Sequence, residues 1–249
     1  PLPLMRMKLR DFKKIFLKPL QHLNNKKLES DLSKKEVYQL FKKIVSGIHS
    51  NLKKHGFKKQ GTNNSYRITE EIYQSLNFQK SSYNDCFTIN ICIRPTYWNR
   101  PEIAYLLSTR RIGNFETGKD KWYEINSNTE STIEHITKLI EKIIIPIFDK
   151  TQTSELIIAN QELLKKEKIF DQSVVLFSAM RITDKKLSKK MLTEKVNTLE
   201  KDDRNVEWIV NEREYFRNLS ELVESEKWDE IQKELDSNKV NFYDLNKNI

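Results

Sequence analysis

Polar side chains of a particular kind gather on two neighbouring segments of this sequence, residues 72–80 and 86–94. Both segments alternate apolar and polar residues, and a period of two predicts β-strands with one buried face and one polar face. The turn-prone residues 81–85 between them predict a hairpin. An ordinary solvated face would carry lysines and glutamates, but the polar positions here carry amides, hydroxyls and an arginine: Asn77, Gln79, Thr88, Asn90 and Arg94.

Such a set of groups suits an anion or a peptide. Amides supply hydrogen-bond donors and acceptors, and arginine offers a planar fork of donors, so together they match a carboxylate, a phosphate or a peptide backbone. A further strand is predicted at 103–111, where Arg110 and Arg111 must point to opposite faces. One of them joins the set, and Arg111 is the candidate. The alternative interpretation is a cross-strand polar ladder, or a face covered by C-terminal helices, with its groups satisfied inside the fold.

An aromatic and basic loop follows the second strand. Trp98 stands there with Tyr97 and Arg100, just before Pro101. Tyrosine, tryptophan and arginine are enriched at binding hot spots, so Trp98 is a candidate contact residue. A loop aromatic that packs under its own domain is the alternative.

Residues that could support catalysis or a metal site do not have the required spacing. His49 and His55 share a predicted helix but lie roughly 120° apart around its axis, and no CxxC or HExxH motif occurs. Cys86 or Cys92 could act as a nucleophile with His135, although small residues that fill a sheet face are the simpler interpretation. We therefore expect no catalytic residues, no metal and no cofactor, and the sequence favours a protein that is not an enzyme.

A well-marked helix precedes the strands. Ser33 and Glu36 form a capping box, apolar residues recur at helical spacing over 37–52, and Gly56 supplies a left-handed C-terminal cap. Strands are then predicted at about 57–61, 65–69, 72–80, 86–94, 103–111 and 121–125.

A second helix follows Asn128 and is predicted to end before Pro146. Beyond residue 153 the periodicity is helical only, in segments near 154–166, 172–181, 184–201, 204–223 and 226–237. This order predicts an α+β fold with an antiparallel sheet of about five to six strands flanked by helices. We divide the chain into a basic N-terminal segment at 1–30, a sheet domain at 31–153, and an all-helical C-terminal extension at 154–249 that packs on the sheet domain.

Charge is distributed unevenly along the 249 residues. The net charge is +9, yet residues 1–60 hold 16 Lys/Arg and 4 Asp/Glu, so the rest of the chain is slightly acidic. Such a basic quarter can bind nucleic acid or an anionic membrane, or it can be an ordinary solvated surface. Cys86 and Cys92 are too far apart on one strand to pair, no transmembrane run occurs, and no signal peptide is recognised. We expect a cytoplasmic protein.

Several motifs resemble those of one family. They are HGFKK at 55–59, NFQKSS at 77–82, FTIN at 87–90, and Arg111-Ile112-Gly113 followed by Trp122. Over roughly residues 35–235 the chain resembles the family catalogued as domain of unknown function 4304. The resemblance implies a fold but no catalytic roles, since the activity of the family is undefined. It adds Trp122 to the candidate binding residues.

Three functions are open at this stage. The first is a non-enzymatic module that binds a protein partner, such as an adaptor or an immunity-type inhibitor. The second is nucleic-acid binding through the basic N-terminal quarter, with no motif for reading bases. The third is docking of residues 4–20 on a membrane surface.

Overall fold

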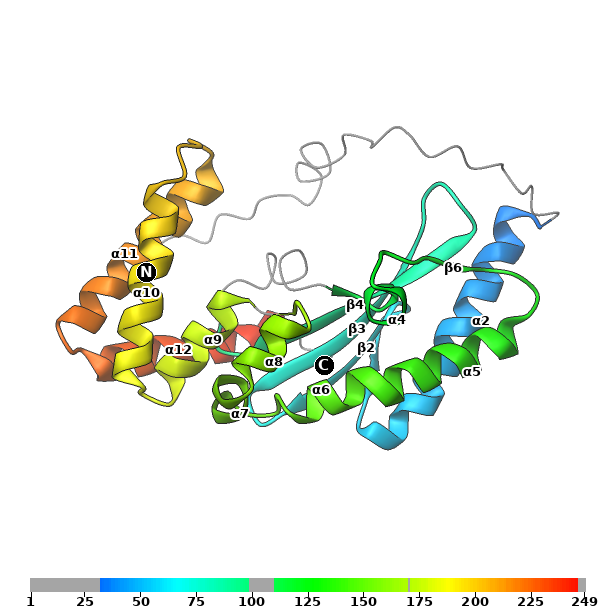
Figure 1. The fold of residues 1–249 in the computed structure, drawn as a ribbon, viewed down its shortest axis with the longest axis horizontal. Helices are drawn as coiled ribbons and strands as arrows, with labels where there is room; N and C mark the ends of the chain where they lie inside the picture. The colour runs from blue at the N-terminus through cyan, green and yellow to red at the C-terminus, as the bar shows by residue number, and fades with distance from the viewer. Residues whose placement is uncertain (1–31, 99–109, 170, 246–249) are drawn as a thin grey trace. The chain divides into compact units, whose positions relative to one another are not determined.

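The computed structural model describes residues 32–98, 110–169 and 171–245 (Figure 1). The basic segment 1–30, the loop residues Arg100 and Pro101, and most of the predicted strand 103–111 lie outside the described residues. All the described residues belong to one compact unit, Leu32–Ile249.

An antiparallel sheet organises this unit. Its strands run in the order β1-β2-β3-β4-β5, and β6 pairs with β4. The hairpin of β3 and β4 has the predicted bounds within one residue, and its register places Asn77 opposite Asn90 and Gln79 opposite Thr88. The sheet with its flanking helices confirms the α+β fold. The strands are β1 (Lys58–Gln60), β2 (Asn64–Thr69), β3 (Ile72–Lys80), β4 (Cys86–Pro95), β5 (Arg110–Arg111) and β6 (Tyr123–Glu124).

Two helical segments cover one face of the sheet. The first, α2 (Lys34–Leu52), begins at the predicted capping box: the Glu36 amide donates to Ser33 Oγ (3.3 Å) and the Ser33 amide to Glu36 Oε2 (2.7 Å). A short 3-10 turn, η1 (Lys53–His55), follows and ends at Gly56, whose φ of 81° is left-handed. The second segment, α5 (Thr129–Leu139), packs against α2.

The helix at α5 does not end before Pro146, contrary to the prediction. It continues through a π-helical stretch, η2 (Ile140–Ile144), into α6 (Ile145–Asp149). Pro146 falls in the first turn of α6, a position where a missing N–H costs little. The helix therefore continues beyond Pro146, because the π-helical turn of η2 ends at Ile144 and a new α-helical hydrogen-bond pattern begins with α6.

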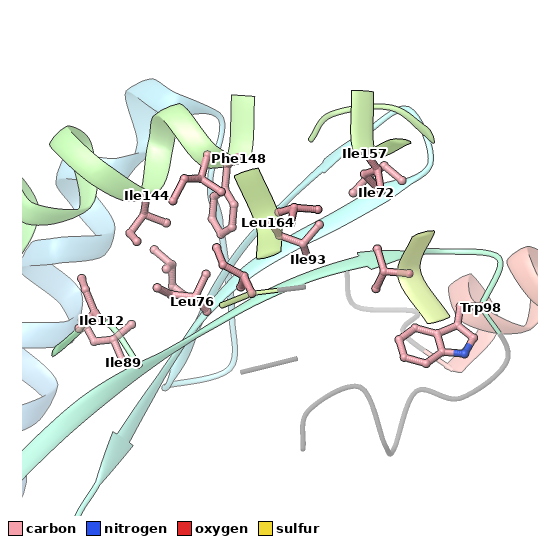
Figure 2. Close-up of a cluster of buried hydrophobic side chains, with 14 of the residues drawn as sticks. Ile72, Leu76, Ile89, Ile93, Trp98, Ile112, Ile144, Phe148, Ile157 and Leu164 are labelled. Atoms are coloured by element: carbon pink, nitrogen blue, oxygen red, sulfur yellow. The ribbon is translucent and has the colours of Figure 1, made fainter. Parts of the chain in front are cut away.

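The main core fills the space between these helices and the sheet. In Figure 2, Leu76 and Ile89 of the sheet face Ile144 and Phe148 of the helical segment, and all four are fully buried. The alternating apolar positions of β3 and β4 account for this face. The opposite face therefore carries the polar positions.

Every described element after residue 153 is a helix, as predicted. Within this region α9 is buried almost all round and contacts β4. The boundary between a sheet domain and a C-terminal extension stays a prediction. The helices are α7 (Ser154–Ala159), α8 (Gln161–Lys166), α9 (Gln172–Arg181), α10 (Lys185–Glu200), α11 (Glu207–Glu224) and α12 (Trp228–Leu245).

One carboxylate at the turn between β2 and β3 joins the sheet to two of these helices. Glu71 accepts hydrogen bonds from Arg181 of α9 (2.6 and 2.7 Å) and from Lys239 of α12 (2.7 Å). Arg181 also donates to Asp236 (2.8 Å). Burial of the Glu71 carboxyl opposes its ionisation, but the bonds from the two cations outweigh burial and lower its pKa.

Candidate binding site on the polar sheet face

A ladder of amide side chains crosses three strands on the face of the sheet opposite α2 and α5. Asn77 Nδ2 donates to Asn64 Oδ1 (2.6 Å), and Asn90 Nδ2 donates to Asn77 Oδ1 (3.1 Å). Asn90 Nδ2 also donates to Gln79 Oε1 (3.0 Å). The strand register creates this row, because it sets Asn64 opposite Asn77 and Asn77 opposite Asn90.

The ladder has more donors than its own acceptors use. Asn90 donates two side-chain hydrogen bonds within the ladder, and Asn77 donates one. Within the part of the chain that the structure describes, the side-chain nitrogens of Asn64 and Gln79 donate no hydrogen bond, and the Gln79 side chain is exposed. The face therefore presents N–H groups to a partner that carries acceptors.

The ladder continues into an arginine on the neighbouring strand β5 and a tryptophan that directly precedes β6. Asn90 is paired in register with Arg111 of β5. The Arg111 guanidinium lies over the Trp122 ring, 4.8 Å from its centre, and forms an ion pair with Asp120. This stacking fixes the arginine fork beside the amides while Asp120 offsets its charge. We call Asn64, Asn77, Gln79, Asn90, Arg111 and Trp122 the amide face.

Thr88 belongs to the same face but is not accessible on it. Its side chain is fully buried opposite Gln79, and its hydroxyl has no hydrogen-bond partner among the described residues; the same is true of the Ser75 hydroxyl, further along the hairpin. Two buried hydroxyls without partners carry a desolvation cost. They border the ladder rather than extend its contact surface.

The two other predicted binding residues are packed inside the fold. Arg94 points from the same face at its other end, where its guanidinium lies over the Phe242 ring of α12 (5.1 Å) and donates to the Trp98 carbonyl (3.1 Å). Trp98 is only 5% exposed and packs against Phe177 of α9. Trp98 is therefore a loop aromatic that packs under its own domain, which is the alternative to a contact residue.

Sequence reasoning missed two members of this neighbourhood. Asn64 lies just before the predicted strand at 65–69, and only the register of β2 against β3 places it at the end of the ladder. Asp120 gave no signal because its pairing with Arg111 depends on a short helix, α4 (Gly113–Thr117), that folds the chain back. An arginine followed nine residues later by an aspartate is too common a pattern to predict a pair.

A cluster of ionisable groups lies where α4 and β6 meet α5. Glu116 accepts hydrogen bonds from Lys121 (2.7 Å) and from the Tyr123 hydroxyl (2.8 Å), and His135 of α5 is 3.3 Å away. Burial opposes the ionisation of Glu116, but these hydrogen bonds prevail and lower its pKa; burial and the nearby carboxylate raise the pKa of Tyr123. Because each group has a partner, the cluster positions β6 and α4 rather than offering an acid or base.

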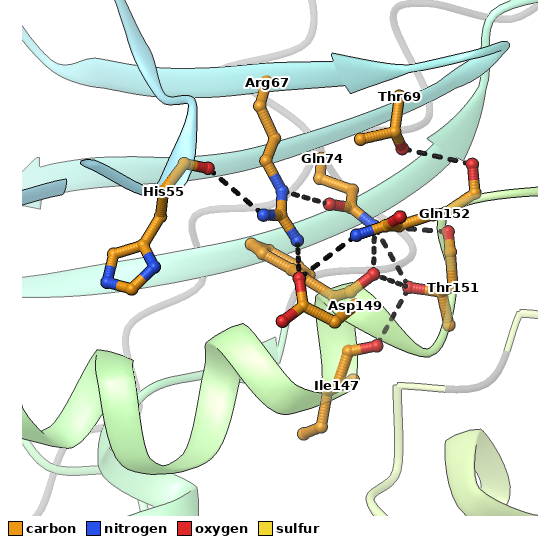
Figure 3. A network of polar contacts seen from close by, with 9 residues as sticks. His55, Arg67, Thr69, Gln74, Ile147, Asp149, Thr151 and Gln152 are labelled. Carbon is orange, nitrogen blue, oxygen red and sulfur yellow. Dashed lines mark hydrogen bonds and ion pairs between the residues drawn. The ribbon is translucent and has the colours of Figure 1, made fainter. Parts of the chain in front are cut away.

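A second polar network is buried under the helices on the core side of the sheet (Figure 3). Arg67 donates to Gln74 Oε1 (2.7 Å), to the His55 carbonyl (3.1 Å) and to Asp149 (2.6 Å). Gln74 in turn donates to the carbonyls of Phe148 (2.6 Å) and Thr151 (3.1 Å). The network is satisfied internally, so its role is to join the sheet to the end of α6.

Two further features bear on function. A groove of about 640 Å³ lies between α2 and α5, and its cations are paired with its carboxylates, as in Lys54–Glu141 (2.7 Å) and Lys138–Glu134 (2.5 Å). Among the described residues, no group of three or more His, Cys, Asp or Glu side chains is placed to hold a metal ion. In the same part of the chain, no helix combines the length and apolar character needed to cross a membrane.

Comparison with known proteins supports the family resemblance over one segment. Residues 48–150 match the family model described as Domain of unknown function (DUF4304). The matched segment is less than half of the chain, yet it contains all six described strands and every residue of the amide face. The C-terminal helices lie outside it. Searches of curated proteins and of solved structures found no match.

Proposed function

We propose that this chain is a non-enzymatic module that binds another protein through the amide face. The observation that carries the proposal is the donor surplus of the ladder: the side-chain nitrogens of Asn64, Asn77 and Gln79 keep N–H groups that no described residue accepts. The strands and the mutual hydrogen bonds hold these donors in place, so ordering them on binding costs little entropy.

The charge of the face favours a protein over a polyanion. The amides are neutral, and Asp120 offsets the charge of Arg111. A partner that supplies neutral acceptors, such as backbone carbonyls and side-chain amides, satisfies these donors without a surplus of charge. Arginine and tryptophan are enriched where interfaces bind most strongly, and Arg111 stacked on Trp122 supplies both.

Capture from cell lysate tests the proposal. The full chain is immobilised at low salt, with and without nuclease, and bound proteins are read by mass spectrometry. We expect one stoichiometric protein that survives nuclease. The purified protein should then bind at least about tenfold more weakly to the Gln79→Ala and Arg111→Ala variants, since hot-spot truncations cost this much or more.

The chain offers a matched control for the arginine. Arg204 forms an ion pair with Asp202 (2.6 Å) and lies over the Trp208 ring (5.6 Å), so it repeats the arginine, aspartate and tryptophan contacts away from the sheet. Arg204→Ala should leave binding unchanged. Equal losses in Arg111→Ala and Arg204→Ala, or no stoichiometric protein at all, would contradict the proposal.

Nucleic-acid binding is the second candidate, and one observation favours it. Lys53 and Lys59 are exposed near His49, whose pKa is lowered by burial and by the charges of these two lysines, and Lys58 is exposed next to Lys59 in the chain. If this basic corner and the N-terminal lysines neutralise six phosphates, the logarithm of affinity should fall with log salt at a slope of about −5. A flat salt response would exclude this function.

The location proposed for the protein is the cytoplasm. No disulfide joins Cys86 and Cys92, the two cysteines of the sequence, as expected in a reducing compartment. Fractionation of cells that produce the full chain tests this location directly.

A further inference from the structure

The tip of the β3–β4 hairpin presents an aromatic ring that the fold does not use. Tyr83 is 86% exposed, more than any other large apolar side chain in the part of the chain that the structure describes. Within the same part, the ring makes no aromatic or cation–π contact and the hydroxyl makes no hydrogen bond. An exposed aromatic of this size carries a hydration cost without any gain in folding.

The turn that carries this ring is nevertheless ordered by hydrogen bonds. Ser81 Oγ accepts from the amides of Tyr83 (3.1 Å) and Asn84 (3.2 Å), and the Ser81 amide donates to the Cys86 carbonyl (2.8 Å). The Ile125 amide donates to the Asp85 carbonyl (2.8 Å), which ties the tip to the end of β6. The ring therefore projects from a turn that is already organised, so little entropy is lost when the ring is buried by a partner.

The tip is continuous with the amide face. Tyr83 follows Gln79 by four residues, which limits their separation to roughly 13 Å at about 3.3 Å per residue. Gln79 carries the exposed unused donors of the ladder, and the same hairpin carries Asn77 and Asn90. A single partner surface of ordinary interface size can contact the ring and these donors together.

We infer that Tyr83 is the aromatic anchor of the protein interface, and that the partner has an apolar recess of ring size bordered by hydrogen-bond acceptors. The recess takes the ring, and the acceptors receive the N–H groups of Gln79 and the ladder. Tyrosine suits this position because its ring is large and rigid and has few rotatable bonds. The inference rests on the proposed function and adds to it the residue that determines specificity.

The test uses the full chain and the protein captured by it, purified. Tyr83→Ala should weaken binding at least about tenfold, and Tyr83→Phe should stay within about threefold because the ring supplies the contact. Tyr38 is the matched control: it is 43% exposed and lies on α2, on the other side of the sheet. Tyr38→Ala should bind like the natural chain.

Hydroxyl-radical footprinting gives a second measurement that needs no substitution. Oxidation of Tyr83 should fall at least about fivefold on complex formation, while oxidation of Tyr38 stays constant. A captured protein that binds Tyr83→Ala as tightly as the natural chain, with unchanged Tyr83 oxidation, would overturn this inference and leave the proposed function standing. Capture of no stoichiometric protein would overturn both.

Discussion

Replacement of Gln74 with leucine tests whether the buried polar network under α6 stabilises the fold. Gln74 is fully buried on the helix-covered face, where it accepts from Arg67 (2.7 Å) and donates to the carbonyls of Phe148 and Thr151. Leucine has a similar volume but offers neither donor nor acceptor. The substitution therefore removes the acceptor of the Arg67 Nε–H and the side-chain donor to two carbonyls, although the Phe148 carbonyl keeps its bonds from the Thr151 amide and hydroxyl.

The size of the effect follows from the bonds that are lost. Two neutral hydrogen bonds contribute about 1 kcal/mol each, and the bond from charged Arg67 contributes about 1.5–3 kcal/mol. The additional apolar burial of leucine offsets roughly 1 kcal/mol. We expect Gln74→Leu to lower the free energy of unfolding by about 3 kcal/mol, which corresponds to a fall of about 6–12 °C in Tm for a chain of this length.

The same strand provides the control. Gln79 lies on β3 with its side chain exposed on the opposite face, so Gln79→Leu should change the free energy of unfolding by no more than about 0.5 kcal/mol. Thermal unfolding and urea unfolding, both followed by circular dichroism, measure the two variants. If Gln74→Leu were as stable as the natural chain, apolar packing could replace the network, and our attribution of stability to it would be wrong.

Three further predictions concern Glu71, Gly113 and Ser33. Glu71→Gln should speed amide hydrogen exchange in α12 at neutral pH, because it removes the carboxylate that holds Arg181 and Lys239. The folded-state pKa of Glu71 is lowered, so this stabilisation is present above its ordinary pKa of 4.5 and is lost as the pH falls through the folded-state pKa. In acid the variant and the natural chain should therefore exchange alike. Gly113→Ala should cost about 1–3 kcal/mol in thermal unfolding, because an added Cβ would lie 2.6 Å from the Lys121 backbone nitrogen, whereas in Gly47→Ala it meets only the movable side chain of Ile133. Ser33→Ala should lower the free energy of unfolding by about 1 kcal/mol through loss of the helix cap, and an unchanged Tm would show that the cap is dispensable.

The fold was predictable wherever the signal lay within a few residues. The capping box at Ser33, the left-handed Gly56 and the alternation along 86–94 each predicted an element whose bounds the structure confirms within a few residues. Pro146 is one exception among the described elements, and α12 is another, since it continues to Leu245 beyond the predicted end at 237. A proline usually ends a helix, but here a π-helical stretch precedes it and places Pro146 in the first turn of α6, where its missing N–H costs little.

The candidate site was only partly predictable, because accessibility depends on contacts between distant residues. The alternation placed Thr88 and Arg94 on the polar face, which is correct, but it could not show that Thr88 is buried or that Phe242 lies against Arg94. Trp98 packs on Phe177, 79 residues away in the chain, and no local pattern reports such a contact. Asn64 joined the ladder only through strand register, which sequence periodicity does not specify across a turn.

The bonds of Glu71 also set an order for folding during synthesis. Glu71 lies in a tight turn that can form as soon as β2 and β3 exist, yet its partners Arg181 and Lys239 follow 110 and 168 residues later. At about 5–20 residues per second, Lys239 leaves the ribosome roughly 10–30 s after Glu71. A β2–β3 hairpin that forms on emergence would carry its turn carboxylate without these two cations for that time, and the contacts with α9 and α12 would complete it only after Lys239 has been added.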